Sequence, residues 1–143
     1  MKTYAIAYFA TLVVFVAVDF VWLSVMADRL YRPVIGEMLA PSFRLGPAIA
    51  FYLFYAAGLT FLAVRPGLMS GSFATAALYG AVLGFTAYAT YDLTNQSTLK
   101  NWSTTLTVAD LIWGTFLSGL AAAAGYGITE RIAGPVERAA GQV

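Results

Sequence analysis

The sequence predicts an all-α integral membrane protein with four transmembrane helices in an antiparallel bundle, and three observations support this prediction. Hydrophobic residues form 60% of the 143-residue chain, charged residues form only 10%, and the mean hydropathy is +0.75. A soluble domain has about 25% charged residues and, at this length, buries only about two-thirds of the surface that its unfolded chain exposes. Four nearly uncharged runs each supply the roughly 20 apolar residues that a membrane-spanning helix needs. The alternation expected of a β-barrel is absent from the sequence.

The four apolar runs occupy residues 3–27, 46–64, 72–91 and 104–128. The first contains Asp19 as its one charged residue, the fourth contains Asp110, and the middle two contain none. Short connections between such runs favour an antiparallel bundle. We expect a single transmembrane domain over residues 1–128 and a polar C-terminal tail over residues 129–143.

The first run also has some features of a signal peptide. Lys2 gives it a positive start, and Val25 and Ala27 fit the small-residue rule for cleavage. The run is too long for the apolar core of a signal peptide and contains Asp19, so a retained span is the favoured interpretation.

The connections differ in length and composition. Residues 27–44 contain Pro33 and Pro41, and prolines this frequent prevent a long helix. We expect an interfacial segment of short helical pieces there, with these side chains facing lipid: Leu30, Tyr31, Val34, Ile35 and Leu39. Residues 65–72 predict a tight turn, and residues 92–103 predict a polar connection.

Small residues in the third run predict a close helix contact. Gly80 and Gly84 are four residues apart, with Ala76 and Ala77 beside them, and such spacing lets a second backbone approach closely.

The distribution of positive charge leaves the orientation almost undetermined. One face of the membrane would carry four positive side chains, Lys2, Arg65, Arg131 and Arg138. The opposite face would carry four as well, Arg29, Arg32, Arg44 and Lys100. The positive-inside rule therefore does not decide, and the free amino terminus slightly favours both termini in the cytoplasm.

Three carboxylates are expected at the same membrane face. With four spans, the first and third connections lie on one side, and Asp19, Asp92 and Asp110 all lie near these two connections. At a rise of about 1.5 Å per residue, Asp19 and Asp110 would lie on the order of 10 Å below the surface. A carboxylate at the bilayer centre costs about 2.5–3.5 kcal/mol even on insertion scales, so such groups face the bundle interior and have a partner or a task. We interpret these three as candidate catalytic acids or bases, or as polar ligands.

Two of the three tryptophans follow these acids at the same spacing. Trp22 comes three residues after Asp19, and Trp113 comes three residues after Asp110, which places each indole on the same helical face as its carboxylate. Candidate substrate-binding residues near this face are Trp22, Tyr91, Asn95, Lys100 and Trp113. Two plainer interpretations stay open. The acids can serve only to hold helices together, and Lys100 can serve as an interfacial side chain.

Composition excludes several classes of chemistry. The chain contains no Cys and no His, which removes disulfides, thiolate nucleophiles, and the usual zinc and haem ligands. The net charge of +1 gives no basic surface for nucleic acid. No cofactor is predicted, although a divalent cation held by Asp and Asn oxygens stays open. The expected partners are membrane lipids, with a homodimer or a larger membrane complex also open.

The chain resembles a bacterial family of small membrane proteins that is known only as domain of unknown function 2177. The resemblance rests on the string from Tyr91 to Asn95 (YDLTN), the following Thr98-Leu99-Lys100 and Trp102, and then Asp110 with Trp113-Gly114. Asp19 with Trp22-Leu23, and Phe51-Tyr52 through Tyr55 and Gly58, are similar to the first two spans of the family. The resemblance implies a four-span protein of the bacterial inner membrane with no established activity, and it hints at fatty-acid modification.

Three functions compete at this stage. The favoured one is binding of a lipid or other apolar small molecule at the acidic face, as part of lipid modification, and whether the protein is an enzyme is left open. The second is a small proton- or cation-coupled transporter, which buried carboxylates would suit. The third is an accessory subunit of a larger membrane complex, with docking surfaces in place of chemistry.

Overall fold

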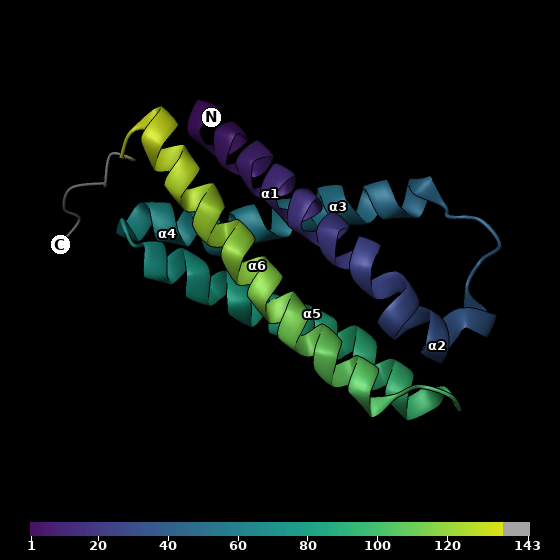
Figure 1. The fold of residues 1–143 in the computed structure, drawn as a ribbon. Helices are drawn as coiled ribbons and strands as arrows, with labels where there is room; N and C mark the ends of the chain where they lie inside the picture. Colours follow the sequence, from purple (N-terminus) through teal and green to yellow (C-terminus); the bar gives the residue numbers. More distant parts are fainter. Residues whose placement is uncertain (136–143) are drawn as a thin grey trace.

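The computed structural model describes residues 1–135, and helices form nearly all of this part of the chain (Figure 1). The long helices are α1 (Lys2–Met26), α3 (Leu45–Leu59), α5 (Phe73–Thr98) and α6 (Thr104–Ala133). Shorter helical pieces extend two of them. The turn η1 (Ala27–Tyr31), α2 (Arg32–Ile35) and η2 (Gly36–Met38) follow α1, while η3 (Thr60–Val64) and α4 (Arg65–Ser70) follow α3.

The helices form four apolar rods, each long enough to cross a membrane. The rods are Lys2–Met38, Leu45–Ser70, Phe73–Thr98 and Thr104–Ala133. Figure 1 shows the start of α1 and the end of α6 at one end of the bundle, with α2 and the α5–α6 connection at the other end. This arrangement confirms the predicted antiparallel order, and it places the first and third connections on the same side.

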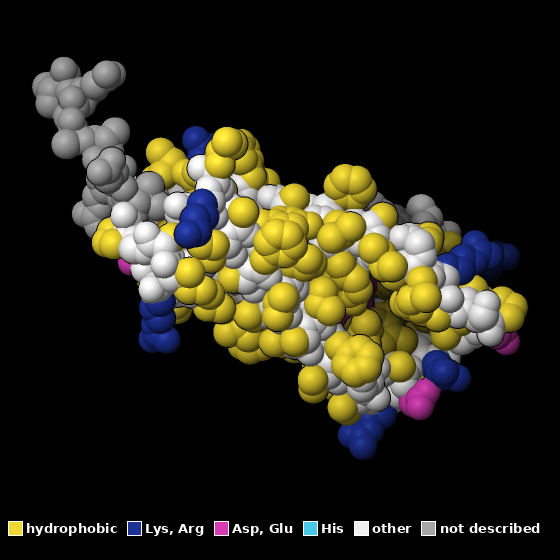
Figure 2. Space-filling view, turned by 90° about the horizontal axis from the view of Figure 1, so that it is seen from above, with side chains coloured by type: hydrophobic (Ala, Val, Ile, Leu, Met, Phe, Trp, Pro, Cys, Tyr) yellow, Lys and Arg dark blue, Asp and Glu magenta, His cyan; other side chains and the backbone are white. Residues whose placement is uncertain are grey.

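The outer surface of the bundle is apolar between two charged ends. Large hydrophobic side chains such as Phe9, Phe54 and Phe61 are largely exposed. In Figure 2, Lys and Arg side chains gather at both ends and hydrophobic side chains cover the middle. Water would not favour such a surface, whereas lipid tails would cover it. The protein is therefore a multi-pass membrane protein, as its composition predicted.

Helix α6 is the centre of the bundle and packs along both α5 and α1. Its contact with α5 is close because glycines lie on the facing surfaces. A Cβ atom added at Gly80 would lie 2.6 Å from both the Ser118 carbonyl oxygen and the Ala122 Cβ atom. A Cβ atom at Gly84 would overlap Gly114 and Ser118 in the same way. The close approach predicted from Gly80 and Gly84 is confirmed.

Two turns of wide helix precede the two Arg-Pro pairs. In η1 and η3 the chain follows a π-helix, in which Arg32 N–H reaches the Ala27 carbonyl and Arg65 N–H reaches the Thr60 carbonyl. Pro33 and Pro66 then occupy the first turns of α2 and α4, where a missing N–H costs least. The short helical pieces predicted after the first span are present. The expectation that the prolines would prevent a long helix was wrong, because the chain stays helical through Met38.

Three predicted boundaries shift outward. Helix α5 continues to Thr98, so the YDLTN string is helical and the third connection is only residues 99–103. Residues 65–70 are α4, and the tight turn narrows to Gly71, whose φ of 63° lies in the left-handed region that suits glycine. Helix α6 continues to Ala133, so the predicted tail begins inside it; residues 136–143 of that tail lie outside the described part.

The glycine contact between α5 and α6 leads to a stability prediction. We expect Gly80→Ala to lower the free energy of unfolding by about 1–3 kcal/mol, because the new methyl group would overpack a tight interface. Gly58→Ala is the matched control, since a Cβ atom added at Gly58 would meet nothing within 4 Å. Thermal unfolding in detergent measures both, and equal midpoints for the two variants would contradict this account of the interface.

Candidate functional site

Asp19 is buried on the inner face of α1 and accepts two hydrogen bonds. It continues a stripe of buried residues at every fourth position, Ala7, Thr11, Phe15 and Asp19. The Tyr52 hydroxyl donates to Asp19 Oδ2 at 2.7 Å, and Trp113 Nε1 donates to Asp19 Oδ1 at 3.1 Å. Asp19 therefore joins α1 to α3 and α6.

Asp110, on α6, is held by a donor from the segment after α1. The Tyr31 hydroxyl donates to Asp110 Oδ1 at 2.5 Å, and the same hydroxyl accepts a bond from Trp22 Nε1 at 3.0 Å. The indole, the phenol and the carboxylate thus form a short relay of hydrogen bonds. The π turn η1 carries Tyr31 and orients it toward the bundle.

The two indoles predicted to accompany the acids stack on each other. The rings of Trp22 and Trp113 are 4.2 Å apart at their centroids, with an angle of 8° between their planes. Trp113 bonds Asp19 from across the bundle, and Trp22 bonds the Tyr31 hydroxyl. We call this set the aromatic–carboxylate network: Asp19, Trp22, Tyr31, Tyr52, Asp110 and Trp113.

Asp92 lies outside this network and is the unusual carboxylate of the protein. It is fully buried on α5, and neither of its side-chain oxygens has a hydrogen-bond partner. It continues the α5 stripe of Ala76, Gly80 and Gly84 by two further turns, which explains its burial against α6. A carboxylate without a donor in such surroundings carries a large desolvation cost.

Asp92 borders a cavity of about 390 Å³, which we call the lateral pocket. Its walls are mainly aromatic, and its lining consists of Phe51, Tyr55, Ala87, Tyr88, Tyr91, Asp92 and Asp110. These residues come from α3, α5 and α6. The lateral pocket therefore brings two of the three predicted acids together, and Asp19 lies nearby in the network.

The lateral pocket exists because α3 and α5 diverge. The η3 and α4 segments pack against α5, whereas α3 itself packs mainly against α1. Figure 1 shows that α3 and α5 diverge with increasing distance from α4, which connects them. Phe51 is 44% exposed and Tyr91 is 59% exposed, so these rings border the side of the bundle where lipid tails would lie.

Two inner walls of the lateral pocket are fixed by packing. The Tyr88 ring lies against the backbone of Gly114, where a Cβ atom would overlap it. The Tyr55 hydroxyl shares a hydrogen bond of 2.8 Å with the Ser118 hydroxyl. These contacts hold two aromatic rings in place around the carboxylates.

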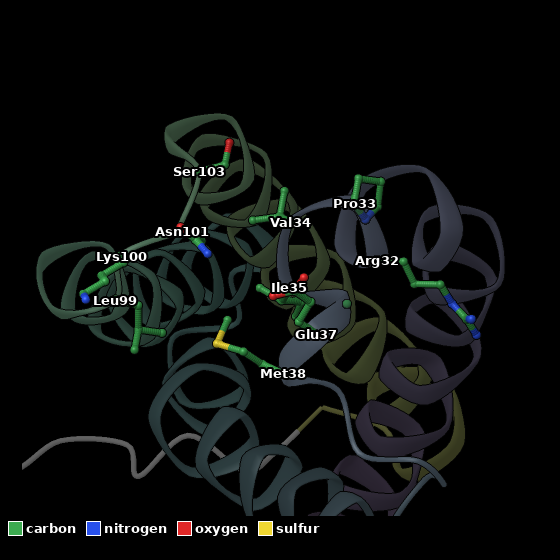
Figure 3. A pocket seen from close by; sticks show the side chains of 11 residues that line it. Arg32, Pro33, Val34, Ile35, Glu37, Met38, Leu99, Lys100, Asn101 and Ser103 are labelled. Carbon is green, nitrogen blue, oxygen red and sulfur yellow. The ribbon is translucent and has the colours of Figure 1, made fainter.

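Of the other predicted residues, Tyr91 borders the lateral pocket and Lys100 does not. Asn95 lies one turn after Tyr91 on α5 and is half-buried. Lys100 is exposed in a separate pocket of about 590 Å³ at the end of the bundle, between residues 32–38 and the α5–α6 connection. In Figure 3, Lys100 and Arg32 lie on opposite sides of that pocket.

Sequence reasoning missed the two tyrosines that hold the acids. Tyr31 was expected to face lipid, and this was wrong, because its hydroxyl bonds Asp110. Tyr52 drew attention only as part of a family resemblance, yet its hydroxyl bonds Asp19. A phenol inside or beside an apolar run is a signal in itself, since a buried hydroxyl needs a partner. In the described residues, no group of three or more acidic side chains is arranged to hold a metal ion.

The sequence matches the model of one protein family. The model of a family described as a predicted membrane protein (DUF2177) matches residues 4–127. The chain belongs to the DUF2177 family. The match includes Asp19, Asp92 and Asp110, and it agrees with the resemblance seen in the sequence. No curated protein and no solved structure matches the chain.

The network in this DUF2177 protein predicts a specific effect of one hydroxyl. Tyr52→Phe removes a donor from buried Asp19, so we expect it to lower the free energy of unfolding by roughly 1–2 kcal/mol. Tyr79→Phe is the matched control, because Tyr79 is 49% exposed. Unfolding in detergent compares the two variants, and a Tyr79→Phe effect as large as that of Tyr52→Phe would refute the assigned role.

The stacked indoles predict an optical signature. Two indoles stacked at 4.2 Å perturb each other's electronic transitions, so the near-ultraviolet circular dichroism changes caused by Trp22→Phe and Trp113→Phe should not add up to the change in the double variant. The change caused by Trp102→Phe should add to that of either one. Additive changes for Trp22→Phe and Trp113→Phe would show that the two rings do not stack.

Proposed function

We propose that this protein binds a membrane lipid or another amphipathic small molecule in the lateral pocket, in the inner membrane of a bacterium and with both termini in the cytoplasm. The observation that carries the proposal is Asp92. A fully buried carboxylate with two unpartnered oxygens lies on the wall of a mostly aromatic cavity. Ionisable groups inside a membrane protein generally mark a functional site, and a ligand that donates to Asp92 would satisfy it.

The size and lining of the lateral pocket support a small organic ligand. Its volume of about 390 Å³ falls within the range of about 300–1,000 Å³ typical of ligand pockets. Such pockets are mainly apolar with a few polar groups that fix orientation. Here Phe51, Ala87 and Tyr88 would contact the apolar part, and Asp92 would hold the polar end.

The two carboxylates of the lateral pocket differ in what they can offer a ligand. Asp110 already accepts the Tyr31 hydroxyl, while Asp92 has no donor. Asp92 is therefore the group that a ligand would engage first. A carboxyl group in this position can also act as an acid or base toward a bound molecule, which is the role that lipid modification would require.

The depth of the acids favours binding over transport. Asp92 is six residues before the end of α5, and Asp110 is six residues after the start of α6. Each lies about 9 Å from its helix end at 1.5 Å per residue. Transporter sites lie near the bilayer midplane, whereas these acids lie toward one membrane face.

Filling the lateral pocket tests the proposal. We expect Ala87→Trp to abolish binding of a molecule from bacterial lipid extract, because the indole would occupy the pocket. Leu78→Trp is the matched control, since Leu78 is on the same helix and 60% exposed. The protein is reconstituted in nanodiscs with the extract, and native mass spectrometry detects the retained molecules. No retained molecule in the wild type, or equal retention by Ala87→Trp, would overturn the proposal.

A further inference from the structure

We infer that the polar end of this ligand is an organic cation, an aliphatic amine or quaternary ammonium group that binds between Asp92 and the aromatic walls of the lateral pocket. The inference rests on the proposed function and adds the chemical class of the ligand. Three features of the lateral pocket carry it: its charge, its rings and its scarcity of oxygen ligands.

When its acids are ionised, the lateral pocket has no positive side chain to balance them. Two carboxylates, Asp92 and Asp110, are in its lining, and none of its lining residues is Lys or Arg. Across residues 1–135, the ion pair present is the exposed one between Asp28 and Arg32, at 2.7 Å. Asp19 and Asp110 obtain donors from neutral phenols and an indole. Asp92 obtains none, so a positive ligand would supply both the missing donor and the missing charge.

The walls of the lateral pocket suit a positive group better than a neutral one. Four aromatic residues line the lateral pocket: Phe51, Tyr55, Tyr88 and Tyr91. The faces of such rings attract ammonium groups, most strongly where water is excluded. Recognition of alkylammonium ligands by cages of aromatic rings uses the same interaction. A neutral alcohol would gain only a hydrogen bond to Asp92.

A metal ion fits this lining poorly. Calcium takes six to eight oxygen ligands, and magnesium requires near-octahedral geometry with several waters. The lateral pocket offers two carboxylates among aromatic rings and Ala87, and no group of three acids suited to a metal occurs in the described chain. An organic cation needs no such shell, because its alkyl groups contact the rings directly.

Two ligands that share an apolar chain and differ in their polar end isolate the contribution of the cation to binding. Dodecyltrimethylammonium and 1-dodecanol are titrated into the full-length protein in maltoside micelles, and calorimetry gives their dissociation constants. We expect the ammonium compound to bind the wild type at least about tenfold more tightly than the alcohol. Asp92→Asn should remove most of this difference and change alcohol binding little. Asp28→Asn is the matched control, since it removes one negative charge from an exposed site.

The outcomes distinguish the inference from the proposal on which it rests. Equal binding of both compounds to the wild type, abolished by Ala87→Trp, would overturn the inference of a cationic ligand and support the lateral pocket as a binding site. Binding of both that Ala87→Trp leaves unchanged would overturn both. If Asp28→Asn and Asp92→Asn both lose the tighter binding of the ammonium compound, that tighter binding comes from the overall charge of the protein, and the inference is overturned. The wild-type comparison holds even where Asp92→Asn does not fold.

Discussion

A carboxylate inside an apolar bundle must find hydrogen-bond donors, and this requirement joins the separate parts of the protein. Asp19 draws Tyr52 from α3 and Trp113 from α6, while Asp110 draws Tyr31 from the turn after α1. Lipid tails offer no hydrogen bonds in their place, so each donor must come from another helix. Three long helices and the η1 turn thereby meet at one end of the molecule.

Helix packing decides where the remaining space lies. Glycines let α5 and α6 approach closely, and one turn beyond Gly84 the Tyr88 ring packs on Gly114. Helix α3 instead packs on α1 and diverges from α5. The lateral pocket lies between α3 and α5, with Asp92 on its wall. The one buried acid without a donor in the described residues thus lies beside the space that helix packing leaves open.

The prolines contribute to this arrangement through the turns that precede them. A π turn places one extra residue in the helix, which redirects the side chains of that turn. In η1 this brings Tyr31 to Asp110, and the chain remains helical as far as Met38. Wide helical turns often occur at functional sites, and here one supplies the hydrogen-bond donor of Asp110.

The sequence by itself determined the four spans, their antiparallel order and the placing of three acids toward one face, because membrane thickness and hydropathy act on local composition. The Gly80–Gly84 contact followed from spacing in the same way. Only the tertiary structure decided the partners of Tyr31 and Tyr52, the stacking of Trp22 on Trp113 and the isolation of Asp92. These depend on how helices distant in sequence rotate and cross, which residue spacing within one helix does not specify.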